Sequence, residues 1–199
     1  MLPTLYCATS NLDKVREFKH ALADFYVVEQ VPRIGEIAAP EETGATFEAN
    51  AVLKAIYYSK FTEEPVFADD SGLEVDAIGG EPGVYSARYS GPQATNEANN
   101  RLVVERMRGI EDRTARFVCV IALAQQCKLL GTFRGSVEGR LLDAPRGTEG
   151  FGYDPLFYYP PFGCSFGEAS LERKSTVSHR GRALAAMIAY LQRASDSSR

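Results

Sequence analysis

The sequence predicts an α/β protein with a mixed β-sheet flanked by helices. Short apolar strands alternate with amphipathic helices in the early part of the chain. Strand-like segments then follow one another with short connections, which favours antiparallel pairing. The chain has 199 residues and is 45% hydrophobic, which is enough for one sizeable folded domain and ordinary for a globular protein.

The N-terminal residues predict a strand, a polar turn and a helix. An apolar run at 5–8 precedes Thr9-Ser10-Asn11, and apolar residues then recur every three or four positions from Leu12 to Phe25. A second short strand is expected around 26–31. A loop rich in proline and acids follows at 39–44.

A second helix is expected after Thr46, which can cap it. Its apolar face consists of Phe47, Ala51, Ala55 and Tyr58. The acids of the preceding loop stand at the start of this helix, where the helix dipole favours negative charge.

Two adjacent carboxylates mark the next strand. The run 65–73 is apolar up to Asp69 and Asp70, so we expect the strand to end in a turn at these acids. Ligands in α/β folds collect at the carboxyl ends of strands, where two acids can hold a hard cation such as Mg²⁺. The same residues are also ordinary turn formers, so this pattern alone leaves both interpretations open.

The rest of the chain predicts more strands than helices. Glycines at 79–91 mark a surface loop, and a third helix is expected over 96–109. Residues 115–125 have strong β character, and 129–142 form one or two further strands. The last helix is expected over 180–194.

Composition and charge argue against several classes of protein. The longest apolar run, 117–124, is far shorter than the ~20 residues that span a bilayer, and the first residues lack the pattern of a signal peptide. A net charge of -4 argues against broad binding of a nucleic-acid backbone. The four cysteines lack Cys-x-x-Cys spacing, and Cys7 and Cys119 lie in apolar runs. We therefore expect reduced, structural thiols in a cytoplasmic protein.

Three further segments carry groups that suit a nucleotide. Thr9 to Lys14 lies at a strand-to-helix turn, where backbone N–H groups and a lysine favour an anion, although an ordinary helix cap is the alternative. The segment 150–154 combines glycines with the aromatic face of Phe151, which suits a stacked base or simply a glycine-rich turn. Lys174 to Arg180 gathers two cations and a histidine.

Six blocks, in order, together resemble the inosine triphosphate pyrophosphatase family. Its members hydrolyse noncanonical purine nucleoside triphosphates such as ITP, dITP and XTP. The blocks are Thr9-Ser10-Asn11-x-x-Lys14, Glu41-Glu42-Thr43-Gly44-x-Thr46-Phe47-x-x-Asn50-Ala51, Ala68-Asp69-Asp70-Ser71-Gly72-Leu73, Pro82-Gly83-Val84-Tyr85-Ser86-Ala87-Arg88-Tyr89, Gly150-Phe151-Gly152-Tyr153-Asp154-Pro155 and Ser178-His179-Arg180.

This resemblance implies a curved mixed sheet in two lobes with a cleft between them. It implies one such domain over 1–194 and a tail, 195–199, to which no role is assigned. It also implies a magnesium-dependent reaction that releases pyrophosphate from a purine nucleoside triphosphate, and a homodimer.

The resemblance also implies roles for individual residues. The catalytic acid matches Asp70, and its acidic partner at the metal best matches Glu42, with Glu41 and Asp69 as near alternatives. The triphosphate contacts match Thr9, Ser10, Asn11, Lys14 and Ser71. Position 10 is often glycine or another small residue in relatives, so Ser10 is a mild departure. The positions that hold the nucleotide and its base match Phe151, Gly152, Tyr153, Asp154, Lys174, His179 and Arg180.

On this interpretation Asp70 and Glu42 hold Mg²⁺, and Asp70 deprotonates the water that attacks the α-phosphorus. Donors from His179, Arg180 or nearby backbone would pair with the 6-oxo group of inosine or xanthine, whereas the amino group of adenine would leave them unpaired. Two alternatives are a Maf-like pyrophosphatase acting on modified pyrimidine nucleotides and a purine nucleotide sensor that does not hydrolyse its ligand. The acids beside lysines favour an enzyme.

Overall fold

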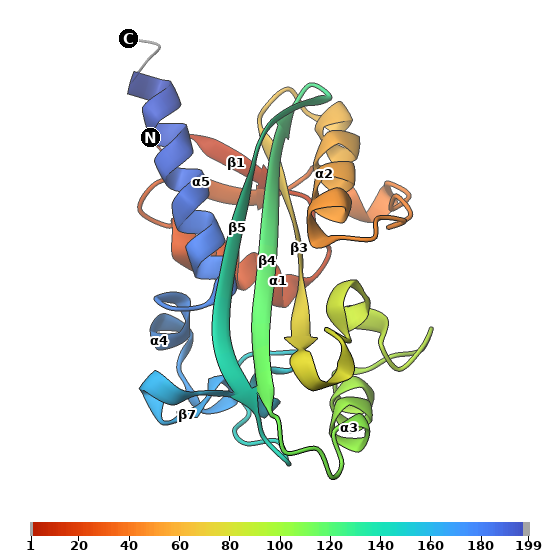
Figure 1. The fold of residues 1–199 in the computed structure, drawn as a ribbon. Helices are drawn as coiled ribbons and strands as arrows, with labels where there is room; N and C mark the ends of the chain where they lie inside the picture. The colour runs from red at the N-terminus through yellow and green to blue at the C-terminus, as the bar shows by residue number, and fades with distance from the viewer. Residues whose placement is uncertain (1, 197–199) are drawn as a thin grey trace. The chain divides into compact units, whose positions relative to one another are not determined.

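The protein is a mixed α/β fold, seen here in a computed structural model (Figure 1). Residues 2–196 are described, with side chains described through residue 194. Of the predicted tail, residues 197–199 lie outside the described part of the chain.

The described chain alternates strands and helices up to its middle. The strands are β1 (Thr4–Cys7), β2 (Val27–Gln30), β3 (Val66–Val75), β4 (Thr114–Gln125), β5 (Lys128–Leu141), β6 (Phe157–Tyr159) and β7 (Cys164–Ser165). The α-helices are α1 (Leu12–Leu22), α2 (Phe47–Tyr58), α3 (Asn96–Arg106), α4 (Leu171–Ser175) and α5 (His179–Asp196). The strands form one sheet in the order β2-β1-β3-β4-β5-β6-β7.

Strand pairing changes direction along this sheet. β1 runs parallel to β2 and to β3, whereas β6 runs antiparallel to β5 and to β7. Only Gln126 and Cys127 separate β4 from β5, and both have positive φ, of 47° and 64°. A two-residue turn of this kind makes a tight hairpin whose twist matches its strands. The mixed sheet is therefore confirmed, and the segment expected to form one or two strands forms one.

The chain forms two compact units, each with its own core. The first unit contains residues up to 70, residues 119–135 and residues from 180 onward. The second unit contains residues 71–118 and 136–179.

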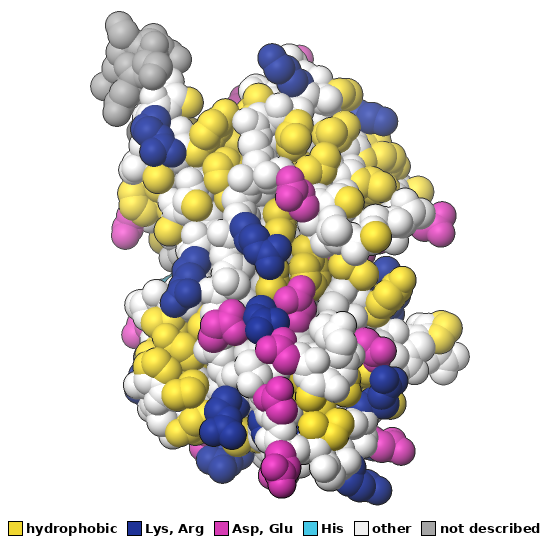
Figure 2. All heavy atoms as spheres, viewed as in Figure 1, with side chains coloured by type: hydrophobic (Ala, Val, Ile, Leu, Met, Phe, Trp, Pro, Cys, Tyr) yellow, Lys and Arg dark blue, Asp and Glu magenta, His cyan; other side chains and the backbone are white. Residues whose placement is uncertain are grey.

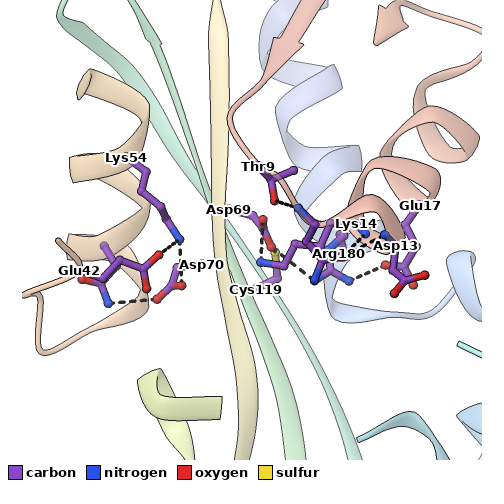
Figure 3. Close-up of polar contacts among 12 residues, drawn as sticks. Thr9, Asp13, Lys14, Glu17, Glu42, Lys54, Asp69, Asp70, Cys119 and Arg180 are labelled. Atoms are coloured by element: carbon purple, nitrogen blue, oxygen red, sulfur yellow. Dashed lines mark hydrogen bonds and ion pairs between the residues drawn. The ribbon is translucent and has the colours of Figure 1, made fainter. Parts of the chain in front are cut away.

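Helices cover both faces of the sheet in the first unit. α1 and α5 pack on one face, where Phe18 and Leu184 belong to the same apolar cluster as Phe67. α2 lies on the opposite side of β3 (Figure 3). Leu12, expected on the apolar face of α1, is instead 72% exposed, because it is the first residue of the helix and lies outside the part that meets the sheet.

Strand β3 differs from the prediction at its two acids. It does not end there but continues through Ser71 and Gly72 to Val75. The 3-10 segment Gly83–Arg88 explains this, because Ser86 Oγ accepts a hydrogen bond from Leu73 N (2.9 Å) and donates one to Gly83 O (2.7 Å). A Cβ at residue 72 would lie 2.5 Å from Gly83 O. Glycine here therefore permits a close backbone contact that keeps β3 extended.

Several predictions from composition can be compared with the structure. Within residues 2–196, every helix is too short or too polar to cross a lipid bilayer. Cys7 and Cys119 are buried, and burial raises the pKa of the Cys7 thiol to about 12. Acidic and basic side chains are interspersed on the face shown in Figure 2.

Candidate active site

The turn before α1 presents a lysine and an asparagine. Asn11 caps the helix, and its Oδ1 accepts hydrogen bonds from Asp13 N (2.9 Å) and Lys14 N (3.2 Å). Asn11 N in turn donates to Thr9 Oγ1 (3.2 Å). Three of the N–H groups that the sequence offered to an anion are thus already used, so the positive charge here comes mainly from Lys14. Ser10 is exposed.

Asp69 lies on the α1 and α5 side of β3 in a buried network of charges. Its carboxylate is 3.0 Å from Lys14 Nζ and 3.4 Å from an Nη of Arg180. Arg180 also forms an ion pair with Glu17. The side chains of Asp69 and Arg180 are only 1% and 3% exposed. Burial alone would raise the pKa of Asp69, but Lys14 and Arg180 outweigh it and hold this pKa below its ordinary value.

Asp70 lies on the opposite face of β3, beside α2. Successive side chains of a strand point to opposite faces, so the two neighbouring acids contact different partners (Figure 3). Asp70 Oδ1 is 3.1 Å from Lys54 Nζ, and the same ammonium is 2.7 Å from Glu42 Oε1. Burial raises the pKa of Asp70 and outweighs the opposing effect of Lys54. A raised pKa makes the Asp70 carboxylate a stronger base than an ordinary aspartate.

Asn50 fixes the loop that carries Glu42. Its Nδ2 donates to Asp70 Oδ2 (3.2 Å), and its Oδ1 accepts from Gly44 N (2.8 Å). A Cβ at residue 44 would lie 2.5 Å from Asn50 Oδ1, so the turn requires glycine there. The acids 41–42 precede α2 within this loop, where Glu41 is exposed and Glu42 contacts Lys54.

The Glu42 and Asp70 pair fits a magnesium ion. Both carboxylates approach a single ammonium group, so their oxygens already face one cation position. Among the described residues, no three His, Cys, Asp or Glu side chains gather as a complete metal site. Mg²⁺ is commonly held by one or two carboxylates together with waters and substrate phosphates, so two carboxylates are sufficient here.

The glycine-rich segment at 150–154 belongs to the second unit and is held by buried contacts. Asp154 Oδ2 accepts from Phe151 N (2.8 Å) and from Lys174 Nζ (2.5 Å). Tyr153 is buried and donates from its hydroxyl to Ser86 O (2.8 Å). Lys174 Nζ lies 5.2 Å from the centre of the Phe151 ring, which is half-buried. This arrangement fixes the backbone that presents Phe151 and Gly152.

His179 and Arg180 begin α5, and neither is a surface residue. His179 stacks on Phe117 with ring centres 4.7 Å apart, within the second unit. Arg180 contacts Glu17 and Asp69 in the first unit, as described above. Ser71 follows Asp70 in β3 and is half-buried. The structure thus groups Lys14 with Arg180, and Asp154 with Lys174.

Sequence reasoning did not single out Lys54 or Glu17, and it quoted Asn50 within a block without giving it a role. A signal existed for Asn50 and Lys54, because they are four residues apart and therefore lie on one side of α2, next to the positions expected to be buried. The signal for Glu17 was weaker: it is an acid three residues after Lys14, which places the two side chains on the same side of α1.

Comparison with known proteins agrees with the resemblance in the sequence. A dITP/XTP pyrophosphatase of Thermus thermophilus is 52% identical over 91% of this chain and 88% of that protein. That of Acidobacterium capsulatum is 46% identical over 96% and 99%. Among solved structures, the Staphylococcus aureus Ham1 protein has a TM-score of 0.84 at 40% identity, with 95% and 98% of the two chains covered. A HAM1 protein from Coxiella burnetii has a TM-score of 0.85 at 37% identity, with 97% and 100% covered. The Ham1 family model matches residues 5–190, and the chain therefore belongs to the Ham1 family.

Proposed function

We propose that the protein hydrolyses noncanonical purine nucleoside triphosphates, namely ITP, dITP and XTP, to the monophosphate and pyrophosphate. Relatives that are named dITP/XTP pyrophosphatases and are about half identical over nearly the whole chain support this activity. The observation that carries the proposal is the approach of Glu42 and Asp70 to one ammonium group beside a fixed loop. A binding protein without catalysis has no need of this pair of acids.

We propose Mg²⁺ as the cofactor, with Glu42 and Asp70 as its protein ligands. When bound, Mg²⁺ would neutralise phosphate charge and polarise a phosphoryl oxygen. Before the ion binds, Lys54 holds the two carboxylates at a fixed separation, since it contacts both. Glu41, which is exposed, and Asp69, which faces Lys14, are less well placed for this role.

Asp70 is the proposed general base. Its carboxylate takes a proton from a water, whose oxygen forms a bond to the α-phosphorus while the bond from that phosphorus to the bridging oxygen of pyrophosphate breaks. Lys14 supplies positive charge for the phosphates, and Asp69 fixes its position. Thr9, Ser10, Asn11 and Ser71 remain proposed triphosphate contacts on the resemblance alone.

The proposed nucleotide and base contacts lie mainly in the second unit. The half-buried ring of Phe151 offers a face for stacking, and the Asp154–Lys174 pair fixes the loop through Gly152 and Tyr153. His179 and Arg180 remain proposed donors to the 6-oxo group. Because both side chains are buried, His179 and Arg180 can select a base only if the base enters the protein deeply enough to contact them.

A substrate panel tests this function. We expect pyrophosphate release from dITP, ITP and XTP with Mg²⁺, and rates on ATP lower by roughly ten- to a hundredfold because an amino group replaces the 6-oxo acceptor. Equal rates on ATP and ITP would remove the argument from base donors. Cleavage of methylated UTP without cleavage of ITP would favour the Maf-like alternative, and nucleotide binding without any pyrophosphate release would favour the sensor.

The homodimer, the cytoplasmic location and the single domain over 1–194 remain proposals from the resemblance and from composition. Light scattering on the purified protein, at a mass twice that of one chain, would support the dimer.

A further inference from the structure

A hollow lies in the second unit, where β5 meets β6. Its volume is about 550 Å³, within the range of small-molecule sites. The side chains that line it include Arg113, Arg140, Asp143, Arg146 and Tyr158. Its lining includes none of the residues assigned above to the triphosphate, the metal or the base.

Two of these arginines extend from backbone that is fixed. Arg140 is paired with Tyr158 across the antiparallel strands β5 and β6, so their side chains are neighbours on one face of the sheet. Arg146 N donates to Pro155 O (2.8 Å), and Arg146 O accepts from Ser165 Oγ (2.8 Å). Little backbone ordering is therefore needed when a ligand binds to them.

The charges in the hollow are unbalanced. The guanidinium of Arg113 donates to the carbonyls of Met107, Leu141 and Leu142, and it lies 3.0 Å from Asp143. In contrast, the guanidinium groups of Arg140 and Arg146 have no hydrogen-bond or ion-pair partner among the described side chains. Three arginines against one aspartate leave two positive charges in the lining, although the whole chain has a net charge of -4.

The acids that interact with these arginines are already hydrogen-bonded or are highly exposed. Asp112 interacts electrostatically with Arg140 and accepts a hydrogen bond from Thr114 N (2.9 Å). Glu168 interacts electrostatically with Arg146 and accepts a hydrogen bond from Ser165 N (2.8 Å). The side chain of Asp143 is 96% exposed, so its pairing with Arg113 is weak and open to competition from a stronger anion.

We propose that this hollow binds the phosphate group of a small phosphorylated molecule. The planar guanidinium groups of Arg140 and Arg146 match the geometry of phosphate oxygens and donate two hydrogen bonds each. Tyr158 adds a hydroxyl and an aromatic surface for the rest of the ligand. The site is independent of the proposed activity, because it shares no residue with the proposed active site.

The test uses a tryptophan as a reporter. The chain has no tryptophan, so Tyr158→Trp places a single fluorophore in the hollow. Inorganic pyrophosphate and inosine monophosphate are titrated separately, with EDTA present and ionic strength held constant with NaCl. We expect a saturable change in fluorescence with at least one of these two ligands. The ligand that binds more tightly shows whether the phosphate alone or the whole nucleotide is recognised.

Matched variants then assign the signal to the arginines. Adding Arg140→Gln and Arg146→Gln should weaken binding about tenfold or more, because two charge-assisted contacts are lost. Adding Arg140→Lys and Arg146→Lys should give an intermediate loss, since charge is kept but the two-pronged geometry is not. The control pair Lys128→Gln and Arg134→Gln removes the same charge from exposed positions outside the hollow and should leave binding unchanged.

Titration of the unmodified chain by phosphorus NMR checks that the reporter itself does not create the site. The proposal is overturned if neither probe gives a saturable signal up to about 10 mM. It is equally overturned if the arginine-to-glutamine pair binds as tightly as the control pair, because the signal then reflects general charge attraction.

Discussion

Replacing Asp69 and Asp70 one at a time by asparagine should separate stability from turnover. The two side chains are nearly the same in shape before and after the change, but they point to opposite faces of β3. Asp69→Asn removes the negative charge between Lys14 and Arg180, and Glu17 alone then balances the two cations. Asp70→Asn instead leaves Lys54 paired with Glu42.

The expected magnitudes differ accordingly. Removing one partner of a buried ion pair costs about 3–5 kcal/mol. The lower value applies to Asp69→Asn, because Lys14 is 17% exposed and keeps part of its hydration. For a chain of this size each kcal/mol lowers Tm by about 2–4 °C, so we expect a decrease of about 6–12 °C. Asp70→Asn should change Tm by less than about 3 °C, because burial already disfavours its charge. Its turnover should fall by about 10²–10⁴-fold with loss of the base.

Two assays decide the comparison. Calorimetry gives Tm for each variant, and pyrophosphate release from dITP at saturating substrate and Mg²⁺ gives turnover well below that temperature. The reasoning is refuted if Asp70→Asn lowers Tm as much as Asp69→Asn does. Near-normal turnover of Asp70→Asn would refute its role as base while leaving the stability argument intact.

Three further predictions concern Asp69, Lys54 and Gly72. The pKa of Asp69 in the folded chain lies below its ordinary value of 3.8, so between these two pKa values the unfolded chain binds more protons. The stability that Asp69 contributes above about pH 4 is therefore lost on acidification. Urea titrations at decreasing pH should show a smaller loss of stability for Asp69→Asn than for the parent. Lys54→Met removes the ammonium shared by Glu42 and Asp70. At equal ionic strength, added MgCl₂ should therefore raise the Tm of this variant more than that of the parent. An equal shift in both proteins would contradict this. Gly72→Ala forces a Cβ against backbone and should cost about 1–3 kcal/mol, measured by denaturant unfolding, with Gly35→Ala, which has open space, as its control.

The order of strands and helices was predictable because it depends on local hydrophobic period. The helix after Asn11 and the helix after Thr46 both begin where the capping residue indicates, since a side-chain oxygen satisfies the first free N–H groups in each. The continuation of β3 past Asp70 was not predictable in this way. It depends on Ser86, which is distant in sequence and supplies a hydrogen-bond partner to Leu73.

The candidate site was predictable in its acids but not in their counter-ions. Asp70 and Glu42 belong to recognisable blocks, whereas Lys54 lies in a helix where a lysine ordinarily faces solvent. Its side chain is only 13% exposed, because two carboxylates from separate segments surround it. The spacing within α2 places Lys54 near the buried positions but does not encode this pairing, which forms only when the loop at 42 and the strand at 70 meet.

The charges on the two faces of β3 explain why a divalent cation is expected on one face only. Beside Asp69, the four charged groups in contact are Lys14, Arg180, Glu17 and Asp69 itself, and their formal charges cancel. Beside Asp70, Lys54 faces two carboxylates, which leaves one negative charge. A cation entering the first network meets Lys14 and the buried Arg180 with no surplus of negative charge, whereas the second network attracts it. Adjacent acids in one strand thus serve different purposes: Asp69 fixes cations of the protein itself, and Asp70 remains available to an ion from solution.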